Sequence, residues 1–393
     1  MLLPYFSSFD KMIDQIYRLT WYYPARESAN IKIYYSTFIF DKKDLMTESN
    51  RPWYMHSLPI NLNGLDIVKC NNDLRFRAIT FLNLLMGHTI IVWDESRYKT
   101  LFYRILKAVG ILSVVDHKIS SYESDVNYVS LIHKNSDSHN FDKIRENSYQ
   151  LFKEKVTYLR TKYKNVYIFG RGPSLGDATK FDFSDGVRIV CNQTVRDETL
   201  MKHIKPHFLT ACDHALHYGC SKLADYFRND LIKYVNKNNV LFLLPMDIYP
   251  LFVYHYPKLT EKVIGIPYKG TDYNFDLIND FRIKGSVGIL QEILFPVAAT
   301  IGQNVKMLGI DGKEPEDISD RVWTYASVAD YPEEIVKSIH ASRPGYYDND
   351  MTDFEKLYED ELGEMIHKAS KSRIHIETLV PSNHLPLQDK YYG

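Results

Sequence analysis

The sequence predicts an α/β protein with a Rossmann-like open, mostly parallel sheet in its C-terminal domain and a smaller N-terminal α/β domain. One observation behind this prediction is the alternation of strand-like and helix-like segments along the chain. A second is the stretch 166–175, Val-Tyr-Ile-Phe-Gly-Arg-Gly-Pro-Ser-Leu, in which a buried strand runs directly into a glycine loop. A third is that polar residues follow successive predicted strands, at the edge where open α/β sheets bind ligands.

The length and composition are typical of a globular protein with two domains. The chain has 393 residues, of which 45% are hydrophobic and 25% charged, and it is long for a single hydrophobic core. Its formal net charge of -1 supplies no basic field, so we expect no nucleic-acid partner. The four cysteines have neither metal-site nor disulfide-framework spacing, which favours free thiols in a reducing compartment.

The sequence predicts neither a signal peptide nor a membrane span. The N-terminus, Met-Leu-Leu-Pro-Tyr-Phe, lacks a basic start followed by an apolar segment. The most apolar run, 285–302, contains Gln291, Glu292 and Pro296, and it therefore predicts a buried helix. We expect a cytoplasmic protein.

The first predicted domain, residues 1–140, contains no recognisable catalytic motif. Residues 120–146 are polar and predict a linker or surface loops, with the domain boundary between 135 and 145. The predicted helices of this domain cover 11–23, 73–86 and 98–109, and its predicted strands cover 31–40, 65–69, 88–93 and 111–115.

The second predicted domain, residues 141–393, shows clearer strand and helix patterns. The predicted helices cover 147–163, 289–301 and 354–367, and the predicted strands cover 166–169, 186–191, 207–211, 240–244 and 304–308. The residues that follow the second and third of these strands are Asn192, Gln193 and Thr194, and Cys212, Asp213 and His214.

The loop after the first strand of this domain is a candidate phosphate site. Glycines let a backbone approach a ligand closely, and free N–H groups there can face an anion. A simple tight turn would have the same Gly-x-Gly-Pro string. The loop consists of Gly170, Arg171, Gly172, Pro173 and Ser174.

A second candidate anion site precedes the helix 289–301. Backbone N–H groups at a helix start can bind a phosphate or a carboxylate, and two basic residues lie next to this one. The alternative is structural, with Ser286 capping the helix and Asp311 capping a turn. The candidate residues before this helix are Arg282, Lys284, Gly285 and Ser286, and those after the strand that follows it are Gly309 and Asp311.

Five short strings together carry a resemblance to a known family. In chain order they are Tyr-Ile-Phe-Gly-Arg-Gly-Pro-Ser-Leu, Val-Cys-Asn-Gln, Arg-Ile-Lys-Gly-Ser-Val, Leu-Gly-Ile-Asp and Leu-Val-Pro-Ser-Asn-His-Leu. This order and spacing resembles the bacterial lipooligosaccharide sialyltransferases, which bind a CMP-activated acidic sugar, over residues 160–390. Bacterial β-Kdo transferases and motility-associated flagellin glycosyltransferases have related architecture.

The resemblance implies donor-binding roles for residues in each string. The glycine loop would lie against the nucleotide phosphate and ribose, Asn192 would contact the donor, and Gly285 and Ser286 would lie near its carboxylate. Asp311 would lie near the cytidine, and the segment 381–383 would close the nucleotide side. The expected substrate-binding residues are Gly170, Arg171, Gly172, Pro173, Ser174, Asn192, Gln193, Arg282, Lys284, Gly285, Ser286, Gly309, Asp311, Tyr346, Tyr347, Ser382 and Asn383.

Three residues compete for the chemical step. Asp213 replaces a family asparagine, and it is a nucleophile of a retaining transfer, a hydrogen-bond partner of the ribose, or without chemical role. An inverting transfer needs a base for the acceptor hydroxyl, usually a histidine. In the family this histidine precedes a Thr-Asp pair, which matches residues 352–353 here. His340 is the nearest upstream histidine, although its alignment needs a gap of several residues, and His214 is the alternative base.

The acidic run that precedes the last predicted helix could be interpreted as a metal site, because hard cations prefer carboxylate oxygens. Acids are also expected at a helix start, and the resembling enzymes need no metal. We therefore expect no cofactor, the CMP-sugar being a co-substrate. The run contains Asp348, Asn349, Asp350 and Asp353.

The expected function is transfer of an acidic keto-sugar, sialic acid-like or Kdo, from CMP to a cell-surface glycan such as lipopolysaccharide or capsule. The expected partners are the CMP-sugar, the glycan acceptor, and either the inner membrane face, with the protein peripheral to it, or other glycan-assembly proteins. The alternatives are a nucleotide pyrophosphokinase similar to pterin diphosphokinases and a non-catalytic nucleotide- or glycan-binding module. The first domain would bind the acceptor or dock onto a partner.

Overall fold

The computed structural model divides into two compact units. The first comprises Met1–Ser138, His214–Asp225 and Glu333–Pro344, and the second comprises His139–Asp213, Tyr226–Pro332 and Gly345–Gly393. The structure describes residues 6, 8–23, 31–35, 38–39, 41–60, 62–70, 78–79, 81–82, 90–92, 101–108, 112–114, 138–313, 331–341 and 352–392.

The first unit combines short parallel strand pairs with helices, which confirms its α/β class. β1 (Ile31–Tyr35) pairs with β2 (Leu65–Lys69), and β3 (Ile90–Val92) pairs with β4 (Leu112–Val114). Its other elements are α1 (Phe9–Tyr22), α2 (Lys42–Leu45), a 3-10 turn (Glu48–Asn50), α5 (Leu101–Ala108), α9 (His214–Tyr218), α13 (Glu333–Lys337) and a second 3-10 turn (Ser338–Ala341).

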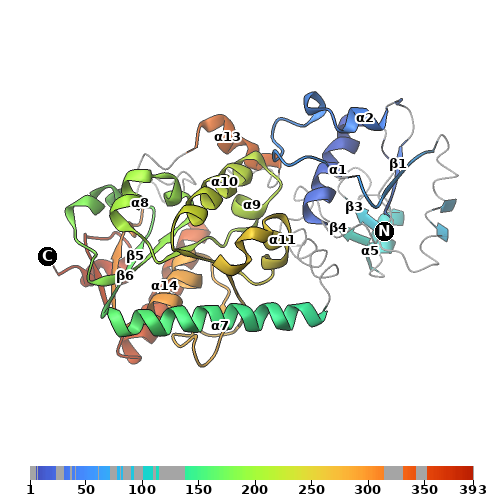
Figure 1. Cartoon of the computed structure of the whole chain (residues 1–393). Coiled ribbons are helices and arrows are strands. Elements are labelled where there is room, and N and C mark those ends of the chain that lie inside the picture. Colours follow the sequence, from blue (N-terminus) through green and yellow to red (C-terminus); the bar gives the residue numbers. More distant parts are fainter. Residues whose placement is uncertain are drawn as a thin grey trace. The chain divides into compact units, whose positions relative to one another are not determined.

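A sheet of seven strands, all parallel, organises the second unit and confirms the predicted Rossmann-like class (Figure 1). The strand order is β13-β12-β5-β6-β7-β8-β9. The strands are β5 (Asn165–Phe169), β6 (Gly186–Cys191), β7 (Phe208–Thr210), β8 (Leu241–Pro245), β9 (Val263–Ile266), β12 (Asn304–Leu308) and β13 (His375–Thr378), and a separate pair is formed by β10 (Tyr268–Gly270) and β11 (Ile283–Lys284).

The strand order reverses beside β5. From β5 the chain adds β6, β7, β8 and β9 on one side and then returns to place β12 and β13 on the other. The connections that leave the carboxyl ends of the adjacent strands β5 and β12 therefore lead to opposite halves of the sheet. Such a topological switch point is where open α/β sheets bind their ligands.

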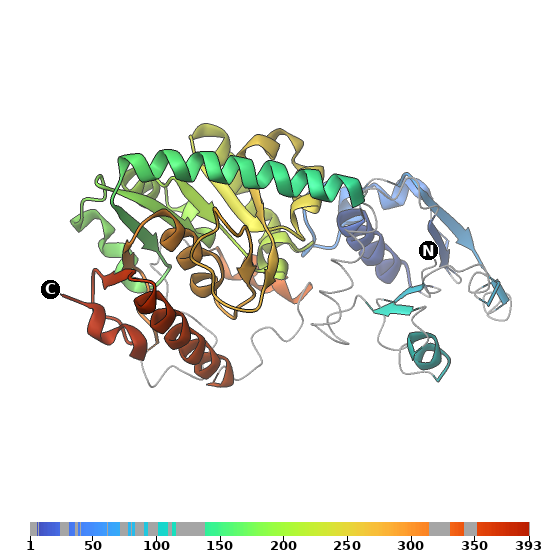
Figure 2. The same ribbon diagram turned by 90° about the horizontal axis from the view of Figure 1, so that it is seen from below.

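Helices cover both faces of this sheet. Figure 2 shows α7 (Ser138–Lys162) running across the strands, and in Figure 1 α8 and α10 lie on the opposite side of the sheet from α7. The remaining helices are α8 (Glu198–Ile204), α10 (Lys222–Lys237), α11 (Tyr249–His255), α12 (Phe295–Ile301), α14 (Thr352–Lys371) and 3-10 segments at Pro173–Lys180, Asn192–Arg196, Pro257–Lys262 and Leu385–Lys390.

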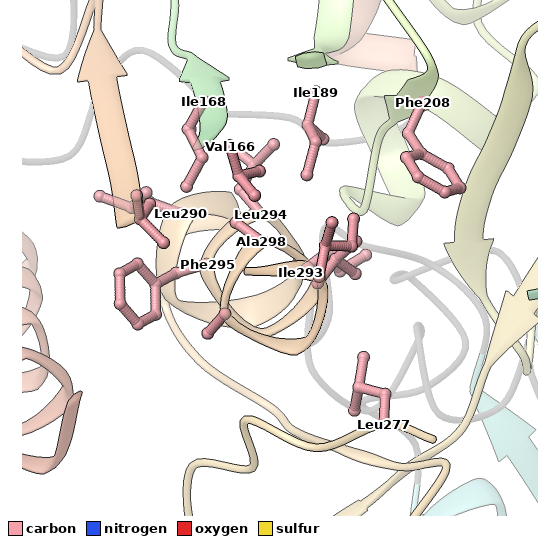
Figure 3. Packing of buried hydrophobic residues seen from close by; sticks show 14 of the residues in the cluster. Val166, Ile168, Ile189, Phe208, Leu277, Leu290, Ile293, Leu294, Phe295 and Ala298 are labelled. Atoms are coloured by element: carbon pink, nitrogen blue, oxygen red, sulfur yellow. The ribbon is translucent and has the colours of Figure 1, made fainter. Parts of the chain in front are cut away.

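The apolar run 285–302 forms the predicted buried helix. Ile293, Leu294 and Ala298 are fully buried and face strand residues such as Val166 and Ile168 (Figure 3). Burial of each large apolar side chain contributes about 1.5–3 kcal/mol, so this helix anchors the centre of the sheet.

The first turn of this helix, Leu290–Leu294, is a π-helix, and α12 follows it directly. The Phe295 N–H donates to the carbonyl of Leu290, five residues earlier. Pro296 has no N–H to donate, so the regular α-helical pattern cannot pass through this point.

The prediction of loops up to residue 146 was wrong from residue 138 onward, because α7 begins at Ser138. Most residues from 141 to 147 are exposed, so this part of the helix needs no apolar stripe and its composition matches that of a loop. The strands β9 and β13 were not predicted either.

In the part of the chain that the structure describes, no helix has the length and hydropathy needed to cross a membrane.

Candidate functional site

The loops after β5 and β12 pack directly against each other at the switch point. The Gly170 N–H donates to the Leu308 carbonyl and the Gly172 N–H donates to the Gly309 carbonyl, both at 2.8 Å. A Cβ on Gly170 would lie 2.2 Å from the Gly309 oxygen, and one on Gly172 would lie 1.8 Å from a carboxylate oxygen of Asp311. The backbone of the second loop therefore leaves no room for a side chain at Gly170, whereas at Gly172 the Asp311 side chain would have to move.

Ser174 and Asp311 link the same two loops through side chains. The Gly309 N–H donates to Ser174 Oγ at 3.0 Å, and the Ser174 N–H donates to Asp311 Oδ2 at 3.2 Å. Burial raises the pKa of the Asp311 carboxyl, while the hydrogen bonds from Ser174 and the nearby His384 act in the opposite direction. Gly309 has a φ of +75°, a backbone conformation that glycine adopts without strain.

The late segment at 382–383 contacts this pair of loops. Ser382 Oγ donates to the Ile310 carbonyl at 2.7 Å, and the Asn383 N–H donates to the Asp311 carbonyl at 2.6 Å. His384 stacks on Tyr358 and contacts the Glu359 carboxylate. Residues separated by more than two hundred positions along the chain are thus brought to one place.

The loop after β6 is tied to the loop after β5. Arg171 Nη1 donates to Gln193 Oε1 at 2.7 Å. The adjacent Asn192 has a φ of 53°, in the left-handed region that a non-glycine residue adopts at some energetic cost. Its buried Oδ1 accepts no hydrogen bond from any described residue. A strained backbone that holds an unsatisfied amide oxygen next to a glycine loop is typical of a ligand contact.

The backbone hydrogen bonds of β7 continue to Ala211. Asp213 follows two residues later, at the same edge of the sheet, and its side chain is half-buried. Its neighbour Cys212 has a pKa well above the ordinary thiol value, because of burial first and then the negative charges of Glu292 and Asp213. Burial and Glu292 also raise the pKa of the Tyr268 hydroxyl. The thiol of Cys212 is therefore protonated at neutral pH and is not a thiolate nucleophile.

The predicted anion site at the start of the 289–301 helix is occupied by a carboxylate of the chain itself. Glu361 of α14 accepts hydrogen bonds from the Ser286 hydroxyl and, at 3.1 Å, from the Val287 N–H. Lys284 pairs with Glu364, one turn further along α14, at 3.1 Å. A Cβ on Gly285 would enter open space, so packing does not require glycine there.

The remaining predicted site residues are dispersed. Arg282 pairs with Asp280 at 2.6 Å and lines a separate cavity of about 670 Å³. His214 starts α9 and His340 lies in the turn Ser338–Ala341, both in the first unit, and the side chain of His340 lies outside the described residues. The residues Tyr346, Tyr347, Asp348, Asn349 and Asp350 also lie outside the described residues, whereas Asp353 lies in the first turn of α14.

Two acidic groups were missed from the sequence. Glu292 was recognised only as a polar interruption of an apolar run, yet it is buried in the π-helical turn beside Cys212 and Tyr268. Asp247 follows β8 and acts on the same tyrosine, and its position directly after a predicted strand was an available signal. Within the described residues, no three His, Cys, Asp or Glu side chains are grouped as metal ligands would be.

Comparisons with known proteins give one likeness. No protein-family model matches the chain, and no curated protein matches it. Among solved structures it is similar to that of the sialyltransferase CstII from Campylobacter jejuni in complex with a substrate analogue, CMP-3FNeuAc. The sequence identity is 18% and the TM-score 0.33, and the match covers 58% of this chain and 85% of that one.

Proposed function

We propose that this protein is a glycosyltransferase that moves an acidic keto-sugar, sialic acid-like or Kdo, from CMP to a glycan acceptor. The observation that supports this most is the convergence of four separate strings of the sequence at the switch point of the sheet. These are the glycine loop, the Asn192–Gln193 pair, the Gly309–Asp311 turn and the segment Ser382–Asn383, which are connected by hydrogen bonds or by adjacent strands.

The groups at this edge suit the polar parts of a CMP-sugar. The unsatisfied Oδ1 of Asn192 can accept a hydrogen bond from a ribose hydroxyl or from the cytosine amino group. The Asp311 carboxyl, whose pKa is raised by burial, offers a further acceptor beside the glycine loop. Open space at Gly285 leaves room for part of the donor sugar.

The chemical step needs negative charge near the anomeric carbon while CMP leaves, because an oxocarbenium-like centre develops there. Asp213 lies at the correct edge of the sheet to supply it, either as a nucleophile or as an electrostatic partner. His340 and His214 remain candidates for the base that takes the acceptor proton. We place the protein in the cytoplasm, peripheral to the inner membrane, with a lipopolysaccharide or capsule glycan as acceptor.

The test is incubation with CMP-Neu5Ac and, separately, CMP-Kdo, with CMP release measured and the product linkage determined by NMR. Asn192→Leu should lower turnover by at least about fivefold, since a lost hydrogen bond to a ligand costs about 1 kcal/mol or more. Asn304→Leu is the matched control, because Asn304 is exposed at the opposite end of β12.

Equal turnover in the wild-type protein and Asn192→Leu would contradict the site assignment. Consumption of ATP that EDTA abolishes, with no consumption of either CMP-sugar, would favour the pyrophosphokinase alternative. Binding of CMP without transfer would favour the non-catalytic module. A sugar adduct on Asp213 in mass spectra would identify the nucleophile, and an inverted product without an adduct would exclude that role.

A further inference from the structure

The second unit contains a basic cavity that begins at the edge of the sheet opposite to the candidate site and extends along α8 to Val195 and Arg196. Its volume is about 710 Å³, within the range of small-molecule sites. Tyr163 and His207 line it immediately before the amino ends of β5 and β7. Because all strands of the sheet are parallel, their amino ends lie a full strand length, roughly 16 Å for five residues, from the switch point.

The lining of this cavity concentrates positive charge in a chain whose net charge is only -1. Seven basic side chains and two acidic ones line it. Both acids already have partners: Glu198 pairs with two of the lysines, and Asp230 accepts a hydrogen bond from Tyr331. The basic residues are Lys155, Lys162, Arg196, Lys202, Lys205, Lys233 and Lys237.

Four of these lysines form no ion pair with any residue that the structure describes. They are Lys155, Lys162, Lys205 and Lys237. Burial lowers the pKa of Lys155. Burial, together with the positive charges of Arg188, Lys155 and Lys162, lowers the pKa of His207 to about 3. Lys155 and Lys162 thus add to the effect of burial in keeping His207 neutral.

A structural explanation accounts for only part of this charge. The cavity lies at the carboxyl ends of α7, α8 and α10, where lysines commonly compensate the helix dipole. Each helix end contributes about half a negative charge, so three ends offset about 1.5 charges. The excess of five positive side chains is larger than that, and Lys155 does not lie in a last helical turn.

We infer that this cavity is a second ligand site, distinct from the switch point, which binds a compound carrying two or more closely spaced phosphate groups. Six of the seven basic residues are lysines, whose compact ammonium groups bind phosphate oxygens as point charges. The half-buried or exposed rings of Tyr158, Tyr163 and Tyr234 also line the cavity and provide faces for a sugar ring or base attached to the phosphates.

The probe is inorganic tripolyphosphate, titrated into the full chain by calorimetry at low ionic strength. We expect one binding site whose affinity decreases as salt is added and does not change when CMP is present at saturation. In the triple variant Lys155→Gln, Lys205→Gln and Lys237→Gln, binding should weaken by more than about tenfold, since each lost charge-assisted contact weakens binding by about that factor.

The matched control replaces three exposed lysines of the same unit outside the cavity, Lys258→Gln, Lys356→Gln and Lys371→Gln, and should bind as the wild type does. Equal affinity in the two triple variants, or no binding to the wild-type protein, would overturn the inference. If the cavity triple variant does not fold, as judged by its Tm, the single variant Lys237→Gln at the exposed end of α10 takes its place.

A second measurement identifies the source of the phosphates. Sedimentation with phosphatidylcholine vesicles that contain phosphatidylinositol 4,5-bisphosphate, lost in the cavity variant and retained in the control, would indicate a lipid headgroup. Binding of tripolyphosphate without vesicle association would indicate a soluble ligand. Turnover of a CMP-sugar is read separately, so failure of this inference and failure of the proposed function are distinguishable.

Discussion

Single glycines determine how closely the two loops of the switch point can approach. A Cβ on Gly170 would meet a backbone oxygen, which cannot move away, whereas one on Gly172 would meet the end of the Asp311 side chain. Overpacking of this kind costs about 1–3 kcal/mol. We expect Gly170→Ala to lower the free energy of unfolding by the upper part of that range and Gly172→Ala by less, as measured by urea denaturation.

Gly176→Ala is the control for this prediction, because a Cβ there has no neighbour within 4 Å. It should leave the free energy of unfolding within about 0.5 kcal/mol of the wild type, as surface substitutions usually do. Similar losses at all three glycines would show that the close approach of the loops is not the cause.

At the same scale, His207 makes stability depend on pH. Burial and neighbouring positive charges lower the pKa of this histidine to about 3, and the Arg188 N–H donates to its Nδ1 at 3.2 Å, which requires an unprotonated nitrogen there. An unfolded histidine has a pKa of about 6.5. Between these values the unfolded chain binds more protons, so the free energy of unfolding falls as the pH is lowered from 6.5 towards 3.

We expect His207→Gln to lose less stability than the wild type when the pH is lowered from 7 to 4. The difference is at most about 1.4 kcal/mol per pH unit, and it is reduced by solvent screening because the ring is half-exposed. Urea denaturation at both pH values measures it. His203→Gln, at an exposed position of α8, is the control, and parallel losses in all three proteins would contradict the assignment to His207.

At the scale of elements, α14 holds the start of the buried helix through two carboxylates one turn apart. Glu361 accepts from the Ser286 hydroxyl and the Val287 N–H, whereas the pair between Glu364 and Lys284 lies at an exposed rim. Hydrogen bonds to a charged group contribute about 1.5–3 kcal/mol, while surface ion pairs contribute about 0–1 kcal/mol.

Glu361→Ala should therefore lower the free energy of unfolding by about 1.5–3 kcal/mol, and Glu364→Ala by less than about 1 kcal/mol. The two substitutions remove the same group from the same helix, so helix propensity changes equally in both. Equal effects in thermal or urea unfolding would mean that the contacts of Glu361 add nothing to those of a surface acid.

At the scale of the whole molecule, the C-terminal segment completes both the sheet and the candidate site. β13 pairs with β12, and Ser382 and Asn383 hydrogen-bond to the loop after β12. A chain that ends at Ser372 should therefore lose CMP binding, as measured by calorimetry, and expose apolar surface around β12 to a fluorescent dye. A chain that ends at Asp389 keeps these contacts and should bind CMP as the full chain does. Binding of CMP by the shorter chain would contradict this account.

The class of the second unit could be predicted because its strands are buried on both faces. β5 is apolar after Asn165 and β6 is apolar except for Arg188; clear turn residues follow both, and their bounds were nearly correct. β13 is an edge strand with three polar residues out of four, and β9 contains a glycine, so neither has such a pattern. The placement of β12 beside β5 is a property of the tertiary fold that no local pattern encodes.

The candidate site was predictable to the same extent. Glycines, Asn192 and Asp311 follow strands, and strand ends can be recognised locally. That the glycines face a second loop of the same chain, and that Glu361 occupies the helix start, depends on contacts between residues far apart in sequence. Glu292 was concealed because a buried acid within an apolar run resembles a simple interruption of that run.

The position of β5 has a consequence for how the protein is made. β5 is the first strand of the sheet to leave the ribosome, yet one of its two neighbours, β12, is translated only after β9. Asn165 of β5 therefore cannot pair with Asn304 of β12 until the intervening chain has been made. Until then the backbone N–H and C=O groups along one edge of the apolar strand β5 are unpaired. Exposed strand edges of this kind make nascent chains prone to aggregation. Such distant pairing also slows folding. The strand that forms the candidate site is therefore the one that a chaperone would need to shield longest during synthesis.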